Sequence, residues 1–178
     1  MILSKSKILL ELNHTIFISP FDEGHLNSNS YDLTLSEHLK VYRENMLDMA
    51  KAYNPCDIII PSDGFILKPN QLYLGSTVEQ TCSTKYIPII EGRSSIARLG
   101  LFVHISAGLG EAGFDGHWTL ELTCVKPLKI YPKVRICQIY FNEISGEIDY
   151  CQSKKYQHST EAMPSRMYDE LKENDTSC

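Results

Sequence analysis

The sequence predicts a mainly β protein with little helix, folded as a sandwich or a barrel. Short runs rich in β-branched and aromatic residues alternate with turn signals along most of the chain. Strands are expected at 58–60, 65–67, 71–77, 87–90, 101–105, 117–124 and 135–141. Turns are expected at 61–64, 68–70 and 114–116, where Gly and Asn tolerate a positive φ and Pro fixes its own. Many short strands at close spacing favour an all-β architecture.

The chain divides into one β domain, residues 1–150, and a polar tail, residues 151–178. A length of 178 residues suffices for one domain with a substantial core. Within the domain, residues 4–13 are expected to form a short helix, while residues 35–52 show no assignable period. The tail is too polar to bury much apolar surface, so its composition favours a mobile segment without a function. The alternative is a lid that closes over bound phosphate.

Charge and composition exclude several classes of protein. Acidic residues number 22 against 17 basic ones, so no broad basic surface predicts a nucleic acid partner. The apolar stretches near the N-terminus are much shorter than the roughly 20 residues that span a membrane, and none resembles a signal peptide. Six cysteines without a CxxC pair fit neither a zinc cluster nor a disulfide framework. We therefore expect a soluble cytoplasmic protein without zinc.

Two motifs that suggest chemistry lack the context that they need. Residues 108–113 satisfy G-x-G-x-x-G, but the residues that follow read as a turn and a strand, whereas a dinucleotide site needs a helix there. The zinc deaminase pattern requires His-x-Glu and Pro-Cys-x-x-Cys. Pro55-Cys56 has no second cysteine at position 59, and no histidine is followed two residues later by glutamate.

The segment from Arg93 to Arg98 is the strongest candidate for binding phosphate. Arg93, Ser94, Ser95 and Arg98 bring two guanidinium groups and two hydroxyls together within six residues. These groups hold phosphate oxygens by charge-assisted hydrogen bonds. The alternative is a surface loop whose arginines pair with nearby acids. Apolar residues on both sides of the segment indicate that the fold holds it in place, which favours the phosphate interpretation.

Glu121 is the candidate for moving protons. Alternation along 118–124 predicts that Glu121 and Thr119 share one face of a strand, with Leu120 and Leu122 on the other. A glutamate on a strand is most often simply exposed to solvent. If this face lines a pocket instead, the carboxylate is suited to general acid–base catalysis.

The order of several motifs closely resembles the dCTP deaminase family of the dUTPase-like superfamily. The matching stretches are Gly64-Phe-Ile-Leu-x-Pro69, Leu74-Gly-Ser-Thr-Val-Glu79, Glu91-Gly-Arg-Ser-Ser-Ile-Ala-Arg-Leu-Gly100, Val103-His-x-x-Ala107-Gly, Gly113-Phe-x-Gly116-His and Thr119-Leu-Glu-Leu122. Outside this core, Met1–Ser4, Ser30–Leu33, Lys155–Gln157 and Pro164–Arg166 also match in the same order. The resemblance thus spans nearly the whole chain.

This resemblance implies a distorted β-barrel or jelly roll of the dUTPase-like type, assembled as a homotrimer with active sites at subunit contacts. It implies deamination of dCTP to dUTP and ammonia, without zinc and with Mg²⁺ carried by the triphosphate. In this family Glu121 corresponds to the general acid–base, while Ser94 and Arg98 position the attacking water and polarise the ring. The implied substrate-binding residues are Arg93, Ser94, Ser95, Ile96, Ala97, Arg98, Ala107, Glu111, Thr119, Leu120, Glu121, Gln138, Tyr150, Lys155 and Ser159.

The chain departs from the family pattern in two places. Glu111 replaces the aspartate expected to contact deoxyribose, which moves the carboxylate about 1.5 Å further out, roughly one C–C bond. Ser159 stands where the family often has a phosphate-contacting glutamine, and the stretch before Lys155 is shortened. Two alternatives to the dUTP-forming deaminase stay open: a bifunctional enzyme that continues to dUMP and pyrophosphate, and an inactive nucleotide-binding regulator.

Overall fold

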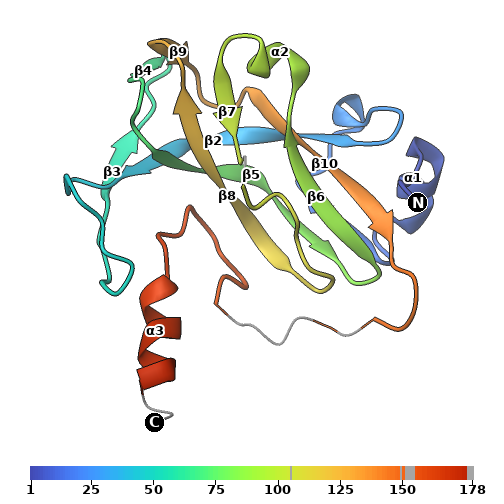
Figure 1. The fold of residues 1–178 in the computed structure, drawn as a ribbon. Helices are drawn as coiled ribbons and strands as arrows, with labels where there is room; N and C mark the ends of the chain where they lie inside the picture. Colours follow the sequence, from blue (N-terminus) through green and yellow to red (C-terminus); the bar gives the residue numbers. More distant parts are fainter. Residues whose placement is uncertain (105, 149, 151–154, 176–178) are drawn as a thin grey trace.

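A curled β-sheet dominates the computed structural model, which describes residues 1–104, 106–148, 150 and 155–175 (Figure 1). The strands are β1 (Ile16–Ser19), β2 (Tyr31–Val41), β3 (Cys56–Ile59), β4 (Phe65–Leu67), β5 (Tyr73–Ser83), β6 (Tyr86–Gly92), β7 (Leu101–Val103), β8 (Asp115–Cys124), β9 (Leu128–Ile130) and β10 (Arg135–Glu143). The helices are α1 (Lys5–Glu11), η1 (a 3₁₀ turn, Glu23–His25), α2 (Ser94–Ala97) and α3 (Met167–Asp175).

The main sheet has eight strands. Its central order is β6-β10-β2-β5-β8-β7, with β1 paired to β5 and β3 paired to β2. β4 and β9 form a separate two-stranded sheet. The end strands β6 and β7 contact each other, so the sheet curls into a nearly closed barrel. The predicted mainly β fold with minor helix is therefore confirmed.

Each of the seven strands predicted from the sequence is present, and three strands were missed. β1, β2 and β9 are additional, and β5 extends further than expected. β2 was missed because buried polar residues interrupt its apolar pattern: Asp32 and Thr34 are both buried and take their partners from distant parts of the chain. A pattern read along one strand does not show such partners.

Of the predictions made from local signals, the N-terminal helix is confirmed and one turn lies earlier than expected. The short N-terminal helix is confirmed as α1, and the hydroxyl of Ser4 caps it by accepting a hydrogen bond from the Lys7 N–H. The G-x-G-x-x-G match ends in a turn and leads directly into β8, so that motif does not open a helix. The turn expected at 114–116 falls earlier, with Gly113 at φ 88°, and Asp115 and Gly116 already belong to β8.

The described part of the tail lies along the free edge of β8. β7 covers only the end of β8 from Leu122 to Cys124. Further back along β8, the N–H of His158 donates to the carbonyl of Asp115 (2.7 Å), and the N–H of His117 donates to the carbonyl of Ser159 (2.9 Å). A Cβ on Gly116 would lie only 2.7 Å from Oγ of Ser159, so glycine permits this close approach. The polar composition does not predict this pairing, because the hydrogen bonds that hold the segment reach residues of β8 more than 40 positions away.

Candidate active site

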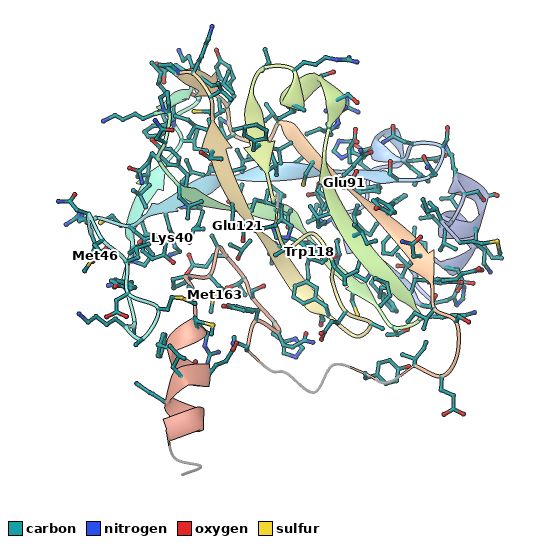
Figure 2. All side chains as sticks on the ribbon, viewed as in Figure 1. Lys40, Met46, Glu91, Trp118, Glu121 and Met163 are labelled. Atoms are coloured by element: carbon teal, nitrogen blue, oxygen red, sulfur yellow. The ribbon has the colours of Figure 1, made fainter. Side chains whose placement is uncertain are left out.

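A pocket of about 620 Å³ opens between β8, the segment before it, the loop after β2 and the tail. β8 contributes His117, Trp118, Thr119 and Glu121. The tail closes the opposite wall with residues that include Met163, which Figure 2 shows near Glu121. The volume lies within the range of small-molecule sites. The strand face that carries Glu121 therefore does line a pocket.

The alternation predicted for β8 is confirmed. Thr119 and Glu121 are partly exposed to the pocket, while Leu120 and Leu122 are fully buried in the core. The Glu121 side chain is 35% exposed, yet its Oε2 atom is buried against the ring of His104. The exposed remainder of the side chain faces the pocket, where a ligand and a water molecule have room.

His104 is the immediate neighbour of Glu121. Its Nδ1 atom lies 2.6 Å from Oε2 of Glu121, although the ring is not aligned for a regular hydrogen bond. His104 adopts a positive φ of 55°, its N–H donates to the carbonyl of Glu121 (3.1 Å), and its ring packs edge-on against Trp118. The histidine thus holds the carboxylate between the core and the pocket.

The free edge of β8 leaves main-chain groups of Thr119 and Glu121 without a partner among the described residues. The main-chain groups of Asp115 and His117 bond to the tail, and the carbonyl of Glu121 accepts from His104. Alternation along the strand turns the N–H and C=O of Thr119 to this same edge. The side chain of Thr119 is occupied, because its Oγ1 accepts from the N–H of Met163 (2.9 Å). The edge therefore presents the N–H and C=O of Thr119, and beside them the N–H of Glu121, to a ligand.

The segment before β8 brings Ala107 and Glu111 to the pocket. It lies across β6, since the N–H of Ile90 donates to the carbonyl of Gly108 and the N–H of Gly110 donates to the carbonyl of Pro88, each at 2.8 Å. Gly110 packs against the ring of Trp118 so closely that a Cβ would collide with it. This glycine allows the segment to curve over the pocket.

The Arg93 to Arg98 segment lies elsewhere. Arg93 occupies the N-cap position of α2, and Ser94, Ser95, Ala97 and Arg98 are exposed at the end of the barrel opposite α3 (Figure 1). Like partly buried Ile96, none of them lines the pocket. Arg93 pairs with the buried carboxylate of Asp32 (3.0 Å) and donates to the carbonyl of Arg135 (2.9 Å). Within one chain, the predicted phosphate-binding segment thus lies apart from the Glu121 pocket.

The remaining predicted residues have structural partners. Gln138 accepts from the hydroxyl of Ser30 (2.9 Å) and donates to the carbonyl of Gly92 (3.3 Å), so it braces the strand end that leads into α2. Ser159 lines the pocket and donates from Oγ to the carbonyl of His117 (2.6 Å). Tyr150 lies against Gly113, and Lys155 forms an ion pair with Glu170 of α3.

Several pocket residues were not assigned a role from the sequence. His104 lies inside one of the matching motifs, but nothing in the strand pattern shows that its ring would face Glu121. Tyr42, Leu47 and Met163 line the pocket from segments that have no strand pattern. Their positions depend on how the β2–β3 loop and the tail fold back onto the barrel, and no local signal in the sequence reports that.

Within the described ranges, no group of three or more His, Cys, Asp or Glu residues is arranged to hold a metal ion. The four cysteines in those ranges, Cys56, Cys82, Cys124 and Cys137, form no disulfide. None of the described helices has the length and apolar character needed to cross a bilayer.

Known proteins match this chain along most of its length. A family model described as dCTP deaminase-like matches residues 2–144. A protein from Clostridium beijerinckii named "dCTP deaminase, dUMP-forming" is 53% identical over 169 residues, covering 94% of this chain and 97% of that protein. A protein of the same name from Hathewaya histolytica is 51% identical over 168 residues, covering 94% and 98%.

A solved structure supports the fold. The crystal structure of a 2′-deoxycytidine 5′-triphosphate deaminase from Agrobacterium tumefaciens superposes with a TM-score of 0.63 at 18% identity, covering 80% of this chain and 48% of that one. The barrel thus has the same fold as that deaminase, as the family resemblance predicted. With the matches in sequence, this places the chain in the dCTP deaminase-like family.

Proposed function

We propose that this protein deaminates dCTP and then hydrolyses the dUTP, releasing ammonia, dUMP and pyrophosphate. The observation that carries the proposal is a carboxylate, Glu121, in a pocket beside the main-chain N–H and C=O of Thr119, which have no partner among the described residues. The sequence alone placed the dUTP-forming deaminase first. The names of the relatives, "dCTP deaminase, dUMP-forming", favour the bifunctional alternative instead.

The Thr119 peptide group supports recognition of a pyrimidine. Its N–H matches the acceptor atoms on the cytosine edge, and its C=O matches the donor on the exocyclic amino group. On one side of Thr119 tail contacts occupy the main-chain groups of β8, and on the other side His104 occupies the carbonyl of Glu121, so the edge has room for one base. In this arrangement the main chain of Thr119 reads the base, and Glu111 lies at the sugar.

Glu121 supplies the proton transfers that deamination requires. It accepts a proton from water as the water oxygen bonds to C4, and it delivers that proton to N3. It then takes the hydroxyl proton of the intermediate and passes it to the amino group, which leaves as ammonia. The two protons of the water thus end on N3 of uracil and on ammonia. General acid–base catalysis of this kind contributes typically 10²–10⁴-fold, by an order-of-magnitude estimate.

The separation of α2 from the pocket of its own chain supports an assembly in which two subunits form each active site together. Ser94 and Arg98 are exposed on this chain and absent from its own pocket. Exposed apolar side chains lie next to α2 on the loop and strand that follow it, Leu99 and Phe102, and on Val125 after β8. Such a surface suits self-association. We therefore propose a homotrimer in which α2 of one copy completes the Glu121 pocket of the next.

The substrate in this proposal is the magnesium complex of dCTP, with Mg²⁺ bound through the triphosphate. The Arg93–Arg98 segment holds the phosphates, with Arg98 as a fixed positive charge that orients and stabilises the reacting groups. The proposed compartment is the cytoplasm, where nucleotide triphosphates are available.

A product assay tests the proposal. Purified protein is incubated with dCTP and Mg²⁺, and ammonia, dUTP, dUMP and pyrophosphate are followed. Ammonia with dUMP and pyrophosphate is the expected result, and ammonia with dUTP alone would reduce the function to deamination. Binding of dCTP without any product would support an inactive regulator instead.

Glu121→Gln is the matched test of the catalytic residue. We expect loss of ammonia release by about 10²-fold or more, with dCTP binding largely retained. Glu37→Gln serves as the control, because Glu37 is half-exposed on β2 and outside the pocket. Appreciable turnover by Glu121→Gln would refute the assignment.

A mixing experiment tests the shared site. Glu121→Gln and Arg98→Ala are each expected to be inactive alone. Co-expressed in one cell, they form mixed trimers in which some sites combine an intact Glu121 with an intact Arg98, so activity returns. No recovery in mixed trimers confirmed by native mass spectrometry, or full activity of a stable monomer, would contradict the shared site.

A further inference from the structure

We propose that Arg135 is a further phosphate-binding residue, positioned beside Arg93 by the buried carboxylate of Asp32. This inference rests on the proposed function, because the ligand is the triphosphate of the nucleotide. Arg135 begins β10 and belongs to none of the sequence motifs discussed above.

Asp32 joins the two arginines. Its Oδ2 atom lies 3.0 Å from Nη2 of Arg93 and 3.4 Å from Nη1 of Arg135. Its Oδ1 atom accepts from the side chain of Asn27 (3.0 Å), and the Asp32 side chain is only 2% exposed. Because one carboxylate oxygen contacts both guanidinium groups, the two groups are close neighbours. Such closeness suits an anion that bridges them.

The two arginines differ in how much of their hydrogen-bonding capacity is used. Arg93 makes two contacts, to Asp32 and to the carbonyl of Arg135, and is about one quarter exposed. Arg135 makes one long contact and is nearly half exposed. A guanidinium group has five N–H donors, so both residues keep donors for a ligand, and Arg135 keeps most of them.

The position of the pair matches the predicted phosphate segment. Arg93 is the cap residue of α2, so Ser94 and Ser95 follow directly. β10 pairs with the end of β6, with Cys137 opposite Gly92, which places the start of β10 beside α2 (Figure 1). Arg135 thus extends the exposed cationic surface formed by Arg93 and Arg98. It was not found from the sequence because 42 residues separate it from Arg93.

A role confined to the fold would have different consequences. If Arg135 only neutralised Asp32, its removal would lower stability and leave the affinity for phosphate unchanged. Arg135→Ala separates these possibilities, because it removes the guanidinium group but retains the main-chain carbonyl that holds Arg93. Arg93 also stays on Asp32, so the remainder of the predicted phosphate segment is undisturbed.

The experiment compares wild type, Arg135→Ala, Arg135→Lys and the control Lys5→Ala, which removes the same charge from an exposed position on α1. Binding of dCTP, deoxycytidine and inorganic tripolyphosphate is measured by calorimetry, and the KM and kcat for dCTP are measured alongside. For Arg135→Ala we expect roughly tenfold weaker binding of dCTP and tripolyphosphate, the usual effect of losing one charge-assisted hydrogen bond. Binding of deoxycytidine and the kcat should be unchanged, and Arg135→Lys should be intermediate.

Unchanged affinity of Arg135→Ala for tripolyphosphate and dCTP would overturn the inference. This holds even if the variant unfolds at a lower urea concentration than wild type, because that would show only a structural role. An equal loss in Lys5→Ala would also overturn it, because the effect would then be that of net charge alone. A wild-type protein that binds tripolyphosphate but releases no ammonia from dCTP would refute the proposed function, while the binding comparison would still decide the role of Arg135.

Discussion

Replacing Glu11 by glutamine is expected to weaken the attachment of α1 to the barrel in a way that depends on pH. The carboxylate of Glu11 is nearly buried and has three partners: Nζ of Lys7 and Oγ1 of Thr15, each at 2.6 Å, and the hydroxyl of Tyr86 at 3.0 Å. These contacts, the Lys7 hydrogen bond above all and the Thr15 bond next, lower the pKa of Glu11 from its ordinary 4.5 to about 2.

The size of the effect follows from this pKa. A fall from 4.5 to about 2 corresponds at most to roughly 3.4 kcal/mol, at about 1.36 kcal/mol for each pH unit. The Lys7 side chain is more than one third exposed, so water screens part of this interaction, and we expect about 2 kcal/mol for Glu11→Gln at pH 7. Because the pKa is lowered in the folded state, the stabilisation is complete above pH 4.5 and is lost as the pH falls toward 2.

Urea unfolding at a fixed protein concentration measures this difference. Glu11→Gln should unfold at lower urea than wild type at pH 7, and the gap should narrow between pH 4.5 and pH 2. Glu147→Gln, at an exposed position, is the control and should match wild type throughout. Equal unfolding midpoints at pH 7, or a gap that does not change with pH, would refute the reasoning.

Three further predictions follow from burial and close packing. Leu120→Ala should lower the free energy of unfolding by about 3 kcal/mol in urea titrations, because Leu120 is fully buried in the core; a loss below about 1 kcal/mol would contradict its core position. Gly116→Ala should detach the tail, since a Cβ would lie 2.7 Å from Oγ of Ser159; unchanged limited proteolysis within residues 155–166 would argue against this docking. Burial raises the pKa of the Cys137 thiol, so iodoacetamide at pH 8 should label it only after unfolding, as read by peptide mass mapping.

Local patterns in the sequence anticipated much of the barrel and one half of the candidate site. The alternation around Glu121 needed only neighbouring residues, because a strand turns successive side chains to opposite faces. Ser4 likewise caps α1 through a hydrogen bond to a residue three positions away. β2 was missed because the partner of Thr34, Glu79, is 45 residues distant, and buried polar residues without visible partners do not read as a strand.

The arrangement of the candidate site could not be predicted in the same way. The sequence suggested that Arg93 and Arg98 act with Glu121, and the family resemblance implied sites at subunit contacts, but only the structure shows that α2 lies outside the Glu121 pocket of the same chain. The two alternatives for Arg93 were phosphate binding and pairing with an acid. The structure shows the pairing with Asp32 and also leaves donors for a ligand, so the two alternatives are compatible.

The sequence by itself determined the β character of this protein, its family resemblance and the residue types capable of the chemistry, because these depend on local periodicity and on motifs along the chain. The tertiary structure decided which of these residues meet. His104 contacts Glu121 across 17 positions of sequence, and Met163 bonds to Thr119 across 44. Asp32 contacts Arg93 and Arg135, which lie 61 and 103 positions further along the chain. Such contacts arise from the curling of the sheet and the return of the tail to the β8 edge, and their geometry is a property of the folded chain as a whole.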